Sequence, residues 1–209
     1  MNAVAPLKAP DTQIAERRDA WAEIEGLLDI RESPLPHRQT ALDWRRGRNE
    51  RPTFGGVYVL WWRQPAPEFL ASLQNRYLHY LGPGNAPLAW EITHECLHVA
   101  PNGLLPLYVG KNASDIADRI GEHLKLQTLR TVDAAATAAF SPRLTTSCQV
   151  RDRLDRLFPE LADTRPLALN NLAFSCIRVD GPNSFVKRFF LEDLAIGLLR
   201  PLFNVDSER

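Results

Sequence analysis

A short segment near the middle of the chain collects four side chains that can bind a phosphate and move protons. Residues 108–111 read Tyr-Val-Gly-Lys, Arg119 follows nine positions after the glycine, and His123 follows four positions later. Hydrolysis of a phosphodiester requires an activated water, positive groups that stabilise the extra negative charge on the phosphate, and a group that stabilises the leaving oxygen. The segment therefore offers a candidate for each of these roles.

The spacing within this segment predicts which of the four side chains lie close together and which of them could accept a proton. On a predicted helix, Arg119 and His123 stand at i and i+4 and project from one face about 6 Å apart, so both can address one phosphate. Tyr108 lies two residues before Gly110, on the same side of a predicted strand. We expect Lys111 and Arg119 to lower the pKa of the Tyr108 phenol from about 10. Either Tyr108 or His123 could then take the proton of the attacking water.

Glu192 stands apart from this segment, in the middle of a predicted apolar helix near the end of the chain. An unpaired carboxylate is costly to bury among apolar side chains, so Glu192 requires a cation. A magnesium ion would serve, because Mg²⁺ binds through one or two carboxylates and takes its other ligands from substrate phosphates and water.

Three strands and a helix are predicted around these positions. Gly56–Trp62 is aromatic and β-branched after two glycines, which is typical of a strand, and Leu107–Gly110 predicts a second short strand. Ser114 is placed to cap a helix that runs to about Gln127. Leu172–Val179 is the third strand candidate.

A last helix completes the pattern after a Gly-Pro-Asn turn. Ser184 is expected to cap this helix and Pro201 to stop it. The order strand, insertion, strand, helix, insertion, strand, helix predicts a small mixed sheet covered by helices, which is the α+β class. The large aromatic side chains outside the motifs are expected in the core: Trp61, Trp62, Phe185, Phe189 and Phe190.

The remaining sequence divides into a predicted extension and two insertions. We expect a helical extension over residues 1–50, with an amphipathic helix at 12–28, and one core domain over 51–209. The insertion at about 63–105 is rich in Pro and Gly, which predicts little regular structure. The insertion at about 128–170 contains one amphipathic helix, marked by Val150, Leu154, Leu157 and Phe158.

Composition limits the class of protein. The chain has 209 residues, 25 basic and 25 acidic, so its formal net charge of zero argues against a non-specific nucleic-acid coat protein. No apolar run approaches the roughly 20 residues that a membrane helix needs, and the N-terminus lacks the apolar stretch of a secretion signal. We expect a cytoplasmic protein with no membrane partner. The three cysteines are far apart and are expected to be free thiols: Cys96, Cys148 and Cys176.

Taken together, the motif residues resemble those of the GIY-YIG nuclease family. The resemblance is carried by six matches in order along the chain: Gly56-Val57-Tyr58, Tyr108-Val109-Gly110-Lys111, Arg119, His123, Glu192 and Asn204. It implies a small three-stranded antiparallel sheet flanked by helices. The implied activity is cleavage of DNA with a single Mg²⁺ ion, for which Mn²⁺ could substitute.

The resemblance also implies a role for each matched residue. Glu192 would be the metal ligand, and Arg119 would hold and neutralise the phosphate. Asn204 would brace the site. Tyr108 would be the leading candidate for the general base or for positioning the water, with support from three further residues: Tyr58, Lys111 and His123.

Two long connections distinguish this chain from the simplest pattern of the family. The two motif tyrosines are 50 positions apart, and the stretch between His123 and Glu192 is also long. Such insertions are similar to those of the family's type II restriction endonucleases, in which added elements read the DNA sequence. A homodimer would suit cleavage of both strands of a symmetric site. A repair or structure-selective nuclease of the same family is the alternative.

Two clusters of arginine bear on DNA binding, because local clustering matters more than total charge. The cluster directly before Gly56 could contact DNA or could be a solvated face: Arg45, Arg46, Arg48 and Arg51. The second cluster lies at 143–156 and fits a solvated helix face better, since Asp152 and Arg156 have ion-pair spacing.

Other functions remain open from the sequence. His94-Glu95-Cys96-Leu97-His98 matches the H-E-x-x-H pattern of zinc peptidases, in which two histidines one helical turn apart bind zinc beside a catalytic glutamate. Pro87 and Pro101 leave room for only a short helix there. A non-catalytic DNA-binding module that retains the nuclease fold is the other alternative.

Overall fold

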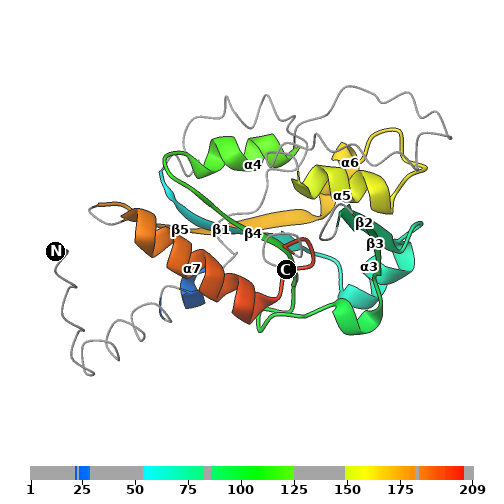
Figure 1. Ribbon diagram of the computed structural model, residues 1–209, viewed down its shortest axis with the longest axis horizontal. Helices are drawn as coiled ribbons and strands as arrows, with labels where there is room; N and C mark the ends of the chain where they lie inside the picture. Colours follow the sequence, from blue (N-terminus) through cyan, green and yellow to red (C-terminus); the bar gives the residue numbers. More distant parts are fainter. Residues whose placement is uncertain are drawn as a thin grey trace.

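The centre of the protein is a three-stranded antiparallel sheet. The computed structural model describes residues 22, 24–28, 54–81, 86–124, 149–181 and 184–204. Strand β1 (Gly56–Trp62) lies in the middle, between β4 (Leu105–Asn112) and β5 (Leu172–Arg178). Helix α4 (Ile116–Leu124) covers one face of the sheet and α7 (Ser184–Leu199) covers the other (Figure 1). The α+β class and the three-stranded antiparallel sheet are confirmed.

Strand β1 is buried along its whole length, because helices cover both of its faces. Val57, Val59 and Trp61 pack in one cluster with α7, and the alternate side chains pack in a second cluster with α4. Gly56 has to be glycine because a Cβ there would lie 1.9 Å from the carbonyl oxygen of Ile177 on β5. The predicted strand and the core position of both tryptophans are confirmed.

Helix α4 begins one residue later than a cap at Ser114 would place it. Asp115 caps it, because its Oδ1 accepts a hydrogen bond of 2.8 Å from the backbone N–H of Asp118. Ser114 is exposed, and its own backbone N–H donates to Asn112 Oδ1 at the end of β4. The Ser114 prediction is therefore wrong. The helix packs into the core through Ile116 and Ile120, which are fully buried.

The first insertion contains regular structure, contrary to the prediction for 63–105. It forms helix α3 (Ala66–Ser72), a separate hairpin of β2 (Tyr77–Leu81) and β3 (Pro87–Glu91), and a 3-10 turn η2 (His94–Cys96). The prolines stand where they are tolerated, in the first turn of α3 and at the first residue of β3. Proline and glycine therefore separate the elements of this region and do not prevent them.

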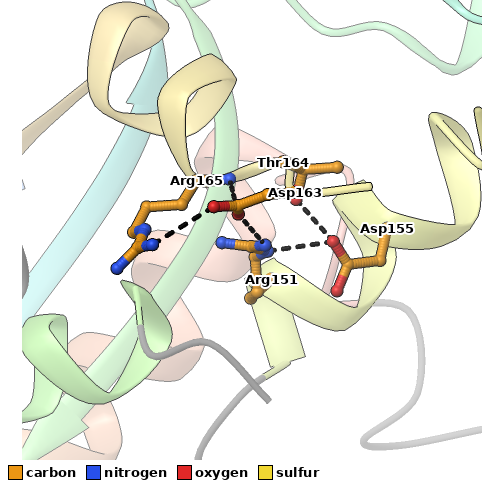
Figure 2. A network of polar contacts seen from close by, with 5 residues as sticks. All are labelled: Arg151, Asp155, Asp163, Thr164 and Arg165. Atoms are coloured by element: carbon orange, nitrogen blue, oxygen red, sulfur yellow. Dashed lines mark hydrogen bonds and ion pairs between the residues drawn. The ribbon is translucent and has the colours of Figure 1, made fainter. Parts of the chain in front are cut away.

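The second insertion forms two helices, α5 (Gln149–Leu157) and α6 (Arg165–Asn171). The predicted apolar stripe of α5 is confirmed, because Val150, Leu154, Leu157 and Phe158 are all buried. A network of ion pairs and hydrogen bonds joins the two helices (Figure 2). The sequence did not predict α6.

The phenylalanines of α7 are not in the core. Helix α7 buries Arg188, Leu191, Ala195 and Leu199 against the sheet, and Phe185, Phe189 and Phe190 are 64%, 41% and 50% exposed. The prediction that these phenylalanines lie in the core was wrong, because α7 carries more apolar residues than one face of a helix can bury. The face that contacts the sheet is the one that contains Leu191.

Two predictions fall on parts of the chain that lie largely outside the described residues. Of the N-terminal extension, Ile24 and Leu27 are described and are buried against the α7 side of the sheet. The arginines at positions 45–51 lie outside the described residues, as does Cys148; Cys96 and Cys176 are free thiols as predicted. Within the described part, no helix combines the length and apolar character needed to span a membrane.

Candidate functional site

Two tyrosines from neighbouring strands face each other across a glycine. Tyr58 of β1 pairs in register with Gly110 of β4, and the ring centroids of Tyr58 and Tyr108 are 6.3 Å apart. A Cβ at Gly110 would lie 2.6 Å from Tyr58 Oη and 2.7 Å from a ring carbon of Tyr108. Gly110 thus lies inside β4 and not at its end, and its missing side chain is what admits both rings.

Helix α4 adds the imidazole and the guanidinium to this pair of phenols. His123 Nε2 and Tyr58 Oη form a hydrogen bond of 2.8 Å, and the His123 ring centroid lies 4.8 Å from that of Tyr108. Arg119 hydrogen-bonds Glu122 at 2.9 Å, and hydrogen bonding to Arg119 also acts on the pKa of both tyrosines. The predicted i,i+4 pair therefore does converge on one place.

Burial controls the protonation of these groups. It raises the pKa of Tyr58 well above its ordinary value of 10 and also raises the pKa of Tyr108, although the Arg119 charge lowers both. The Arg119 charge does lower the Tyr108 pKa as expected, but desolvation outweighs it, so the net pKa is raised and not lowered. Burial, with the charge of Arg119, lowers the pKa of His123 to about 3, so this histidine is neutral near pH 7.

The ionic part of the site lies on the other side of β4. Lys111 alternates with Gly110 along the strand and forms an ion pair with Glu192 of α7. Its Nζ also lies 3.6 Å from the centre of the exposed Phe189 ring. The Glu192 charge is one of the causes that raise the pKa of Tyr58 and Tyr108, so the two sides of the strand act on each other electrostatically.

Glu192 is a largely buried carboxylate whose partner in the structure is a lysine. Its side chain is 14% exposed, and in the structure it already has a cationic partner, as its sequence context predicted. Among the described residues, no group of three or more His, Cys, Asp or Glu side chains could hold a metal. A metal here would therefore take its other ligands from phosphate and water, which is usual for Mg²⁺.

Asn204 holds the free edge of β4 beside Tyr108. Its side-chain amide accepts a hydrogen bond of 2.7 Å from the backbone N–H of Val109 and donates one of 2.8 Å to the carbonyl of the same residue. The backbone N–H of Phe203 donates to Leu107 at 2.7 Å. Both neighbours of Tyr108 are thus fixed by the segment that follows α7.

The solvated helix face predicted for the second arginine cluster is wrong for two of its members, because Arg151 and Arg153 are each only 4% exposed. Sequence reasoning missed Arg153 of α5 as a residue of the candidate site. Its side chain is buried, its Cζ lies 5.7 Å from the centre of the Phe203 ring, and its charge lowers the pKa of both Tyr108 and His123. The available signal was its spacing, because Arg153 follows Val150 by three residues and so belongs to the apolar stripe of α5.

The other candidate motifs have a different environment. The residues His94 to His98 begin as a 3-10 turn of three residues, and no α-helical turn brings the two histidines to one face. His94 and Glu95 are exposed, and Glu95 accepts a hydrogen bond from Thr93. In the second arginine cluster, the predicted pair of Asp152 and Arg156 is present at 2.8 Å.

Of the seven predicted catalytic residues, the structure gathers four on the α4 side of the sheet, which are Tyr58, Tyr108, Arg119 and His123. Lys111 and Glu192 form the adjoining ion pair on the α7 side, and Asn204 holds the strand between them. Comparison of the chain with protein-family models, curated proteins and solved structures finds no match in any of the three.

Proposed function

We propose that this protein is a Mg²⁺-dependent DNA endonuclease of the GIY-YIG type that hydrolyses phosphodiester bonds. One observation carries the proposal: side chains far apart in the sequence lie close together around β4. Tyr58 hydrogen-bonds His123, and the charges of Arg119 and Glu192 both affect the pKa of Tyr58. An ordinary core would not assemble two phenols, an imidazole and a guanidinium beside an acidic group, because such side chains are costly to bury.

Arg119 binds and neutralises the scissile phosphate. The Arg119 side chain is 17% exposed, and its ion pair with Glu122 of the same helix fixes its orientation. Hydrogen bonding between Arg119 and the phenols means that a phosphate held there also lies close to both hydroxyl groups. Fixed donors of this kind stabilise charge at phosphorus without reorganisation during the reaction.

Tyr108 positions the attacking water and accepts its proton only after the phenol has released its own proton to solvent. It is 9% exposed, whereas Tyr58 and His123 are fully buried, so it is the phenol of the site that water can reach. His123 is neutral and hydrogen-bonds Tyr58, and it therefore acts through Tyr58 and not on the water directly. The exposure of Tyr108 and the neutral, fully buried state of His123 support Tyr108 over His123 as the residue that contacts the water.

Glu192 would hold the metal ion, and in the structure its partner is Lys111. A bound Mg²⁺ ion would supply positive charge to the phosphate and the leaving oxygen, and would offset the Glu192 charge that raises the Tyr108 pKa. Lys111, which is 25% exposed, then becomes available to the DNA backbone.

The test compares the full chain with Glu192→Gln on plasmid DNA and on a pool of duplexes of varied sequence, with Mg²⁺ and with Mn²⁺. We expect cleavage by the parent chain and a loss of about a thousandfold in Glu192→Gln. Asp193→Asn is the matched control, because Asp193 is the exposed neighbour of Glu192 on α7. Equal rates for the parent chain and Glu192→Gln would refute the site, and a parent chain that cleaves none of these DNAs would refute the function.

Sequencing the cleaved ends then separates the kinds of nuclease. Defined ends at a repeated sequence would indicate restriction-type cleavage, for which we propose a homodimer because two active sites suit the two strands. Scattered nicks, or cuts confined to branched DNA, would indicate a repair or structure-selective enzyme. Sedimentation of the protein bound to its substrate would give the oligomeric state.

A further inference from the structure

Helix α5 carries three arginines with different surroundings. Arg151 binds Asp155 and Asp163, and Arg156 binds Asp152, so both belong to ion pairs of the α5 and α6 region. The third, Arg153, is only 4% exposed, and α5 packs against α4. It shares the buried stripe with apolar neighbours.

Burying a guanidinium on that stripe is expensive. Val150 and Leu154 beside it are 1% and 0% exposed, and an apolar residue at position 153 would continue the stripe without desolvating a charge. Replacing buried ionic groups by apolar ones is often neutral or stabilising.

Arg153 lies next to the strand that carries Tyr108. Its Cζ is 5.7 Å from the centre of the fully buried Phe203 ring, and the backbone N–H of Phe203 donates to Leu107. The side chain of the following residue, Asn204, hydrogen-bonds both the backbone N–H and the carbonyl of Val109. Arg153 therefore contacts Phe203, and Phe203 and Asn204 together hold the backbone of the two residues on either side of Tyr108.

The charge of Arg153 also reaches the reacting groups. It is one of the positive charges that lower the pKa of Tyr108 and of His123, after burial and Arg119 in each case. Two guanidinium groups, from α4 and from α5, therefore act on the same phenol and imidazole. Inside the protein such a charge is screened far less than at the surface.

We propose that Arg153 is a positioning residue of this site: from α5 it supplies a buried positive charge beside Tyr108 and His123, and through Phe203 it fixes the strand that carries Tyr108. The proposal rests on the proposed nuclease function and adds to it a residue that stands outside the motif set. Arg153 does not touch the DNA, so it affects the catalytic step and not the binding of substrate.

The experiment measures kcat and KM for DNA cleavage by the full chain, by Arg153→Gln and by Arg153→Lys, with Mg²⁺ and one cleavable duplex. We expect Arg153→Gln to lower kcat by about tenfold to a hundredfold while KM changes by less than about twofold. Arg153→Lys keeps the charge and should recover most of the rate. Arg156→Gln, on the same helix but paired with Asp152, should keep the parent rate.

Three results would overturn the proposal: a parent kcat in Arg153→Gln, a rise in KM without a fall in kcat, or a loss of rate that Arg153→Lys does not recover. If Arg153→Gln does not fold, Arg153→Met takes its place because it continues the apolar stripe, and if neither folds the role is structural and the proposal fails. Failure of the nuclease function looks different, because the parent chain would then cleave no DNA at all.

Discussion

Two polar clusters in this protein use buried arginine in opposite ways. In the network between α5 and α6, Arg151 donates to Asp155 at 2.9 Å and to Asp163 at 2.6 Å, and Thr164 and Arg165 complete the hydrogen bonds of those carboxylates (Figure 2). Every charge in that network meets a carboxylate or a guanidinium within the network. Such an arrangement holds two helices together and has no requirement for a ligand.

The candidate site brings arginine to phenols. Arg119 and Arg153 act on Tyr58 or Tyr108, whose hydroxyl groups stay protonated because burial raises the pKa of each. A protonated phenol does not neutralise a guanidinium. The clusters therefore differ in what their arginines act on besides carboxylates: Arg119 pairs with Glu122 but also acts on the two phenols, where we propose that it binds a phosphate.

The largest expected difference between the clusters comes from removing one arginine of each. Arg119→Gln should slow DNA cleavage about a thousandfold with little loss of stability, because its role is to hold the phosphate. Arg151→Gln should lower the free energy of unfolding by about 1 to 3 kcal/mol and leave kcat of the folded protein unchanged, since Asp155 and Asp163 each lose one partner. Cleavage assays and denaturant unfolding of both variants would show it. The comparison fails if the two variants lose the same property.

The second test uses two glycines. Gly110→Ala should lower kcat by about a hundredfold, because the added Cβ lies 2.6 Å from Tyr58 Oη and must displace a tyrosine ring. Gly197→Ala on α7 meets nothing within 4 Å and should raise stability by up to about 1 kcal/mol with no change in rate. Rate assays and thermal unfolding measure the two effects. Full activity in Gly110→Ala would mean that the tyrosine rings do not need this geometry.

The third test separates the clusters by pH. The pKa of His123 is about 3 in the folded protein and about 6.5 when unfolded, so the unfolded chain binds more protons between these values and stability falls as pH falls. From pH 7 to pH 5 this should cost about 2 kcal/mol, and His123→Asn should remove that part of the loss. Denaturant unfolding at the two pH values checks it, and an unchanged slope in His123→Asn would contradict a buried neutral histidine.

The network should respond at lower pH. Burial opposes the ionised form of Asp163, but hydrogen bonds from the Arg165 backbone and from Arg151 outweigh it and lower the pKa of this carboxyl. Its contribution is therefore present above the ordinary carboxyl pKa of about 4 and is lost only as pH falls further. An Asp163→Asn variant should keep the same stability change between pH 7 and pH 5 as the parent protein.

The smallest expected effect distinguishes the two tyrosines within the site. Tyr108→Phe should lower kcat about tenfold more than Tyr58→Phe, because Tyr108 is 9% exposed and can reach the water whereas Tyr58 is fully buried and bonds His123. Single-turnover cleavage rates of both variants give the ratio. A larger loss in Tyr58→Phe would reverse the assignment of the base.

The sequence predicted the parts of this protein whose signals are local. The run from Gly56 to Trp62 predicted a buried strand, and the spacing of Arg119 and His123 predicted a shared helix face, because both depend on the period of one element. The hairpin of β2 and β3 was missed because its prolines and glycines were taken to exclude structure. The phenylalanines of α7 were placed in the core because a pattern cannot show which stripe the sheet will contact.

By itself the sequence determined which chemical groups the chain carries, which elements hold them and the order in which they follow. Only the tertiary structure decided that Lys111 is the partner of Glu192, that Arg153 lies beside Tyr108, and that burial raises the pKa of Tyr108 despite the arginines near it. The reason is physical: pairing and desolvation depend on distances between elements far apart in the chain, and local periodicity contains no information about those distances.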